Sequence, residues 1–234
     1  MKERPILFSA PMVRAILNGS KTQTRRICKP AEQHGLSRVI PTYNSEDGEQ
    51  RPPYITPGWF GDEEGDILFC CPYGVPCDRL WVRETWGLNE PNPCSYDPID
   101  ERGLPDSAYI MANGAKHVLD FWRDRIVFRA SIKGNYTDRE VKRWRPSIHM
   151  PRWVSRIMLE ITDVRVERLH DISEHDAMAE GCAGGHGSIP DYAYNASSDE
   201  HYSWLWDSIN GAGSWNANPW VWVIEFNRIN EVPI

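Results

Sequence analysis

Alternation of apolar and polar positions predicts most of the strands in this chain. Strict alternation over residues 78–86 and 155–169 is typical of half-buried strands, and the second is expected to bend near residues 162–163. Residues 220–226 are apolar on both faces, which indicates a central strand. Shorter strands are predicted at residues 5–9, 22–27 and 126–132.

Three short helices are predicted at residues 10–18, 173–180 and 199–211. Pro11 near the start and Gly19 just past the end fit the first helix. The second has Ser173 as its N-cap and Asp176 three positions later, a variant of the capping box, and it stops at Gly181. The chain therefore has few helices for its number of strands.

This pattern predicts an α+β fold that is mainly β, a closed or half-closed barrel with short helices at its rim. A doubly wound parallel fold would need regular alternation of strands and helices, which the sequence lacks. The length suits a single domain over residues 1–234. Residues 30–66 hold five prolines and five glycines, so they are predicted to be an irregular insertion, and residues 87–120 a second one.

The charge is unevenly distributed along the chain. The net charge is −7, which argues against a general nucleic-acid coat protein. Residues 1–29 and residues 123–168 nevertheless carry a net charge of +6 each. If these segments lie side by side, they form a surface that attracts anions; alternatively, they neutralise the acidic segments within the fold. Eleven tryptophans exceed ordinary usage, and some are expected to line a cleft.

We expect a cytoplasmic protein without a membrane span or a cofactor. No run of about 18 apolar residues is present, and the N-terminal residues lack the apolar region and cleavage site of a secretory signal. The six cysteines are therefore expected to be reduced. They include no CxxC pair, so a metal site is not predicted.

Lys21 and Thr24 are the first candidates for chemistry. A threonine hydroxyl becomes a nucleophile when a neighbouring base takes its proton. A lysine amine can be that base when burial and nearby cations, here Arg25 and Arg26, lower its pKa. In a regular strand, residues 21 and 24 point to opposite faces, so they converge only if Lys21 still lies in the turn. Otherwise, Lys21 and Thr24 lie at the solvent-exposed start of a strand and have no catalytic role.

Two carboxyl groups are further candidates. Glu180 lies in the last turn of the 173–180 helix, where the negative end of the dipole favours the protonated form that a general acid needs. The alternative is an exposed glutamate at a helix end, which is the more common case for such a residue on its own. Glu84 shares a strand face with Val82 and Trp86, where an unpaired carboxylate is costly. Glu84 therefore needs an arginine partner, or it is a protonated functional acid.

Taken together, these residues resemble the ASCH domain, a PUA-like β-barrel family. Residues 19–26 read GSKTQTRR, which resembles the family's motif after the first helix. The chain also resembles the longer, phage-associated branch of the family through RLWVRETW, RPSIHMPRWVSRI, RVERL, LWDSING and NPWVWVIEF. Within the superfamily, small bacterial amidohydrolases that deacylate N4-acetylcytidine carry the motif K-T-x-T-x-R, which aligns with Lys21 and Thr24. Their glutamate lies in a helix whose pattern matches residues 169–180 and corresponds to Glu180.

The resemblance implies a hydrolase that acts on N4-acylated cytosine or cytidine without a cofactor. Thr24 would be the nucleophile, Lys21 the base and Glu180 the acid. The residues expected to bind the substrate are Phe8, Arg26, Glu84 and Trp86. Because other members of the superfamily bind RNA and some are nucleases, the alternative is a module that binds RNA or another nucleic acid, or a ribonuclease, without amidase activity. The oligomeric state stays open.

Overall fold

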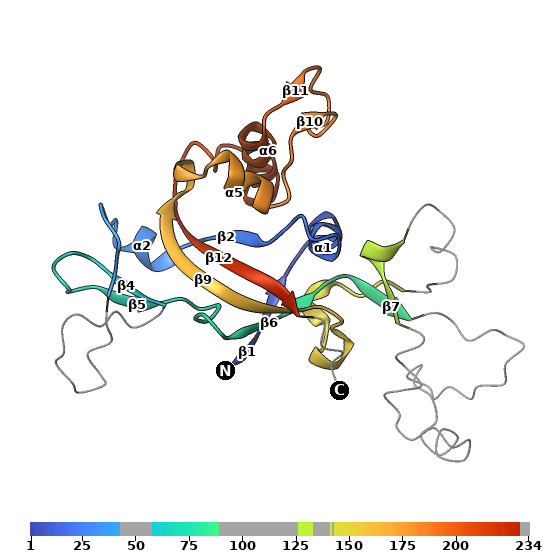
Figure 1. Ribbon diagram of the computed structural model, residues 1–234, viewed down its shortest axis with the longest axis horizontal. Coiled ribbons are helices and arrows are strands. Elements are labelled where there is room, and N and C mark those ends of the chain that lie inside the picture. The colour runs from blue at the N-terminus through green and yellow to red at the C-terminus, as the bar shows by residue number, and fades with distance from the viewer. Residues whose placement is uncertain (43–57, 89–125, 133–140, 142, 230–234) are drawn as a thin grey trace, which may run out of the picture. The chain divides into compact units, whose positions relative to one another are not determined.

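The computed structural model describes residues 1–42, 58–88, 126–132, 141 and 143–229 (Figure 1). Contacts divide the chain into two compact units. The first unit comprises Met1–Ile6, Ala15–Trp81 and Ile157–Val232. The second comprises Leu7–Arg14, Val82–Arg156 and Pro233–Ile234, so the chain passes between the units more than once.

The elements are mostly strands, with a few short helices. The strands are β1 (Glu3–Leu7), β2 (Gln23–Ile27), β3 (Ile40–Pro41), β4 (Trp59–Gly61), β5 (Leu68–Cys70), β6 (Arg79–Arg83), β7 (Trp86–Leu88), β8 (Ile126–Phe128), β9 (Met158–Arg168), β10 (Gly185–His186), β11 (Asn195–Ala196) and β12 (Trp220–Ile229). The α-helices are α1 (Ala10–Leu17), α2 (Lys29–Gln33), α5 (Glu174–Ala179) and α6 (Ser198–Asn210). The 3-10 turns are η2 (Arg129–Ser131), η3 (Ser147–His149), η4 (Arg152–Val154) and η5 (Leu169–Asp171).

The main sheet has five strands in the order β1-β6-β9-β12-β2. β12 is an interior strand, which pairs antiparallel with β9 on one side and with β2 on the other, as the two-sided apolar pattern predicts. Figure 1 shows β9 and β12 as long, curved neighbours. The register shifts where Glu225 and Phe226 pair with Asp163 and Ile161, which leaves Thr162 as an extra residue. This bulge confirms the predicted bend.

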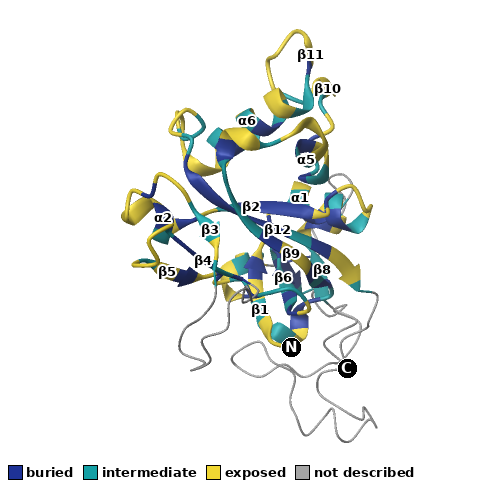
Figure 2. Ribbon diagram, turned by 60° about the vertical axis from the view of Figure 1, so that its left-hand side comes forward, coloured by how far each residue is buried: buried dark blue, intermediate teal, exposed yellow. Residues whose placement is uncertain are grey.

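Both faces of β12 are buried, and most of β2 and β12 is dark blue in Figure 2. On one face, Val221 and Val223 pack in a core with Tyr202 and Trp206 of α6 and with the α5 residue Ala177. The opposite face carries Trp222, whose ring meets Phe60 of β4 and Phe69 of β5 edge-on, at centroid distances of 5.3 and 5.8 Å. Helices therefore cover one face of the strand, and the small sheet β3-β4-β5 covers the other.

The fold class is α+β, as predicted. Among the described strands, β1 and β2 stand at the two ends of the sheet order, and no pairing joins them into a closed barrel. No helix in the described part of the chain is long and apolar enough to cross a bilayer.

Residues 30–66 differ in part from the irregular insertion that the sequence predicts. They contain most of α2, with Pro30 in its first turn, and the strands β3 and β4. The reason is that Phe60 provides an apolar anchor against Trp222, which a search for periodic apolar positions does not detect. Residues 43–57 lie outside the described residues. Of the second predicted insertion, residues 87–88 belong to β7, and the rest lies outside the described residues.

The second unit holds a smaller core of Trp86, Met150 and Val154 beside the paired strands β7 and β8. The predicted strand 126–132 is regular only as far as Phe128 and continues as the turn η2. Gly87 of β7 is required at its position, because a Cβ there would stand 2.4 Å from Val141 Cγ1.

Candidate active site

Lys21 and Glu180 are in direct contact in the first unit. Lys21 Nζ donates to Glu180 Oε2 at 2.5 Å and to the backbone oxygen of Glu180 at 2.8 Å. The side chains of the two residues are 0% and 3% exposed, respectively. Glu180 is therefore buried, and it is not the exposed helix-end glutamate that the sequence left open as an alternative.

Local backbone structure brings this pair together. Gly19, at φ +83°, turns the chain after α1, and Gly181, at φ +92°, ends the helical segment just after Glu180, the C-cap of α5. Lys21 and Glu180 then form an isolated antiparallel bridge, and Thr22 N donates to the Ala179 oxygen at 2.8 Å. The amine is thus fixed at the C-terminal end of α5.

Burial is the largest influence on the Lys21 amine and lowers its pKa. The charge of Glu180 and its hydrogen bond oppose this effect, and the charge of Arg26 lowers the pKa further. The direction and the two causes, burial and a neighbouring cation, are those that the sequence predicts for a lysine base.

A network of charged side chains surrounds Glu180 on the same face of the sheet. Arg25 Nη1 lies 3.7 Å from Glu180 Oε1, and Arg25 Nη2 lies 3.3 Å from carboxylate oxygens of Glu167 and Asp176. Gln23 Nε2 donates to Asp176 Oδ1 at 3.0 Å. Gln23 was not predicted to be part of the site, and Arg25 was predicted only as a neighbouring charge. Strand alternation, which places residues 23 and 25 on one face, was the signal that could have identified both.

Thr24 is buried in β2 but lies on the other face of the strand. Its cross-strand partner is Ile224, and the partner of Arg26 is Trp222, so these four residues share one face. Among the described residues, no hydrogen bond to the Thr24 hydroxyl is observed. The structure therefore joins Lys21 to Glu180, and it leaves Thr24 outside this contact.

The residues expected to bind the substrate are divided between the units. Arg26 is half-buried in the first unit, whereas Phe8, Glu84 and Trp86 belong to the second. Phe8 and Trp86 are buried, and the guanidinium of Arg145 lies over the Trp86 ring, 4.9 Å from its centroid. These two aromatic residues are therefore interior side chains in this structure.

Glu84 has the arginine partner that its sequence position requires. Arg156 Nε and Nη2 donate to its two carboxylate oxygens at 2.9 and 3.0 Å. Burial raises the pKa of Glu84, and the hydrogen bond and charge of Arg156 oppose this effect. The residue is thus one half of an ion pair within the second unit.

Among the described residues, no group of three or more His, Cys, Asp or Glu side chains is arranged to hold a metal ion. Comparisons of the chain with protein-family models, with curated proteins and with solved structures found no match. The resemblance to the ASCH domain therefore stays a prediction.

Proposed function

We propose that this chain is an amidohydrolase that removes the acyl group from N4-acylated cytosine or cytidine. The observation that carries the proposal is the buried contact between Lys21 and Glu180, residues 159 positions apart in the chain. The sequence resemblance assigns these two residues as base and acid, and it supplies the substrate class.

The pair can provide a base and an acid at the same time. As an ion pair it holds one transferable proton on Lys21, and transfer of this proton over 2.5 Å yields a neutral amine and a carboxylic acid. No proton is taken up or released in this step. Burial lowers the pKa of Lys21, which favours the neutral amine that a base needs.

Glu180 has a second feature that fits the role of an acid. Its Oε1 atom is buried and accepts no hydrogen bond from the described residues. A buried acceptor without a hydrogen bond is uncommon in folded proteins, and the charge of the Arg25 guanidinium lies 3.7 Å from this one. In the proposed reaction, Oε2 delivers the proton to the substrate, because it is the oxygen that receives the proton from Lys21.

In the proposed reaction, the Thr24 hydroxyl attacks the acyl carbonyl carbon and gives its proton to the Lys21 amine. Glu180 protonates the exocyclic nitrogen, the C–N bond breaks, and cytosine or cytidine leaves with its amino group. The acyl group is then an ester on Thr24. Water hydrolyses this ester to the free carboxylic acid and restores the hydroxyl and the pair.

Substrate binding has to bring the Thr24 hydroxyl to the amine, because the hydroxyl makes no such contact in the unliganded protein. Because Thr24 lies on the face of β2 opposite that of Gln23 and Arg25, this step requires the start of β2 to rearrange when the substrate binds. When purified protein is incubated with N4-acetylcytidine, the ultraviolet absorbance of the nucleoside is expected to change as cytidine forms. If N4-acetylcytidine and its longer-acyl analogues all stay intact, the proposal is rejected.

A further inference from the structure

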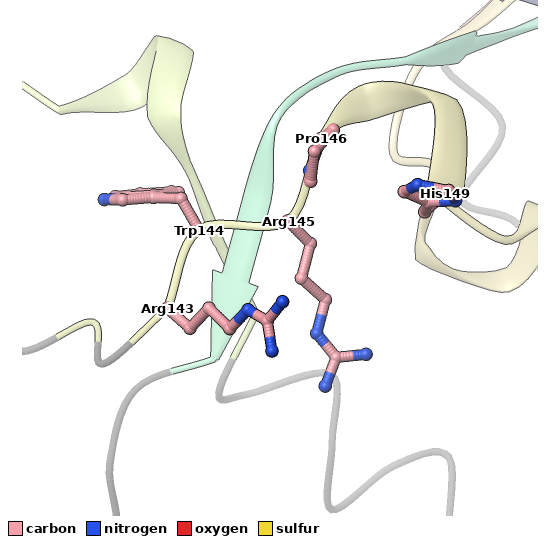
Figure 3. Close-up of a pocket in the computed structure, with 5 residues that line it drawn as sticks. All are labelled: Arg143, Trp144, Arg145, Pro146 and His149. Carbon is pink, nitrogen blue, oxygen red and sulfur yellow. The ribbon is translucent and has the colours of Figure 1, made fainter.

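Arg25 is a buried arginine beside the Lys21–Glu180 pair. Its side chain is 0% exposed, whereas Arg143 and Arg145, which line a pocket in the second unit, are exposed (Figure 3). Burying a guanidinium away from water is costly unless acceptors surround its N–H groups. The contacts of Arg25 therefore decide what its charge can do.

Two strands and one helix provide acceptors for Arg25. Its Nη1 atom donates to Gln23 Oε1 on the same strand, β2. Its Nη2 atom lies 3.3 Å from Glu167 Oε2 on β9 and 3.3 Å from Asp176 Oδ2 on α5. These contacts on several sides fix the planar guanidinium in one orientation.

The guanidinium faces the oxygen of Glu180 that Lys21 does not contact. Lys21 Nζ lies 2.5 Å from Oε2, and Arg25 Nη1 lies 3.7 Å from Oε1. At 3.7 Å the second contact is electrostatic and is not a hydrogen bond. The Glu180 carboxyl group thus lies between two cations, one beside each of its oxygens.

Two further titratable side chains interact with Glu180, and neither adds a charge near neutral pH. They are Cys182, two residues further along, and Tyr202 of α6. Burial raises the pKa of Cys182 to about 12 and raises the pKa of Tyr202 well above its ordinary value of 10.0. Lys21 and Arg25 are therefore the cations that act on Glu180 among the described ion pairs.

We propose that Arg25 is a positioning residue that keeps the Glu180 carboxyl group ionised and its Oε2 atom turned toward Lys21. An ionised Glu180 can accept the proton of Lys21, which frees the amine to act as a base. If Glu180 took its proton from water, Lys21 would stay charged and could not accept the proton of Thr24. Arg25 acts through Glu180 and does not touch the reacting atoms. Its role in turnover rests on the proposed function, but its action on Glu180 can be measured without it.

The test is the pH dependence of kcat for N4-acetylcytidine, measured with the full chain as wild type, Arg25→Met and Arg25→Lys. In Arg25→Met the acidic limb is expected to move by about one pH unit to higher pH, because a carboxyl group that loses a neighbouring cation keeps its proton to a higher pH. KM should change less than about threefold, since Arg25 does not contact the substrate. Arg25→Lys keeps the positive charge and is expected to restore most of the shift.

Arg165→Met is the matched control. Arg165 binds the same two carboxylates, Glu167 and Asp176, but no ion pair joins it to Glu180 among the described residues. It therefore removes a charge from the network and leaves the charge beside Glu180, so the acidic limb should stay within about 0.3 pH unit of the wild type. Circular dichroism shows whether each variant is folded. Equal shifts in Arg25→Met and Arg165→Met, or no shift in Arg25→Met, would overturn the proposal.

A double-mutant cycle separates this role from the proposed function. Urea denaturation of the wild type, Arg25→Met, Glu180→Gln and the double variant measures the coupling of the two side chains, and the same cycle with Arg165→Met is the control. The coupling is expected to be about fivefold or more in the unfolding equilibrium for Arg25 and less than about twofold for Arg165. If the wild type does not hydrolyse N4-acetylcytidine but the Arg25 coupling is present, the proposed function fails and the action of Arg25 on Glu180 stands. Equal coupling in the two cycles rejects that action, with or without turnover.

Discussion

Lys21 and Glu180 show how a single contact can be both structural and chemical. A buried ion pair contributes little net stability, because removing two charges from water offsets their attraction. Removing one partner, however, leaves the other charge buried, with Arg25 at 3.7 Å as partial compensation for Glu180. For this reason, activity lost in a Lys21 variant cannot by itself assign a catalytic role.

The pair is therefore best tested for stability with a double-mutant cycle. Lys21→Met is expected to reduce the free energy of unfolding by about 3–5 kcal/mol. The double variant Lys21→Met/Glu180→Gln should recover part of this loss, since no charge is then left unpaired. Urea denaturation of the four proteins measures the coupling. Losses that simply add would show that the two side chains do not interact.

Glu84 gives a prediction on pH. Burial raises its pKa above the ordinary value of 4.5, so the folded protein holds the proton more tightly than the unfolded chain does. The resulting stability is fully present below pH 4.5 and is lost as the pH rises through the folded-state pKa. The free energy of unfolding of the wild type, relative to that of Glu84→Gln, should therefore fall as the pH rises above 4.5. A difference that is flat or that rises with pH would contradict this account.

At the scale of elements, α5 holds the acid in place through its caps. Ser173 Oγ accepts from Asp176 N at 3.1 Å, and the Asp176 carboxylate in turn contacts Gln23, Arg25 and Arg165. Asp176 thus joins the start of the helix to the network on β2, whereas Ser173 serves the helix alone. The two residues allow these roles to be separated.

Ser173→Ala is expected to lower the free energy of unfolding by about 1 kcal/mol, the usual contribution of an N-cap. Asp176→Ala should lower it further, because the network loses a carboxylate in addition to the cap. Thermal or urea denaturation of both variants provides the comparison. Equal losses would indicate that the contacts of Asp176 with β2 add nothing to stability.

The elements themselves were largely predictable from local patterns. Alternation identified β6 and β9, a segment apolar on both faces identified β12, and the Ser173 and Gly181 signals identified α5. The same alternation already warned that residues 21 and 24 point apart in a regular strand. What local patterns cannot show is the pairing of β2 with β12, which fixes Thr24 on the face of Ile224, or the contact of Phe60 with Trp222. These contacts join residues far apart in sequence.

At the scale of the whole molecule, the two basic segments behave differently. In the N-terminal segment, Lys21 and Arg25 are neutralised by Glu180, Glu167 and Asp176, in line with one of the alternatives that the sequence left open. In the segment 123–168, Arg143 and Arg145 have no carboxylate partner among the described residues. The overall charge of −7 thus does not describe the local charge around Arg143 and Arg145, so the average charge of the chain is a poor guide to its partners.

The hydrolysis of N4-acetylcytidine, measured side by side for the wild type, Thr24→Ala and Thr22→Ala, tests the central claim most directly. Thr22 is exposed and two residues from Thr24, so its variant removes a hydroxyl from the same segment without removing the proposed nucleophile. The account predicts turnover by the wild type and by Thr22→Ala, and a loss of about 100-fold or more in folded Thr24→Ala. Turnover that survives in Thr24→Ala, or is absent from the folded wild type, would contradict it.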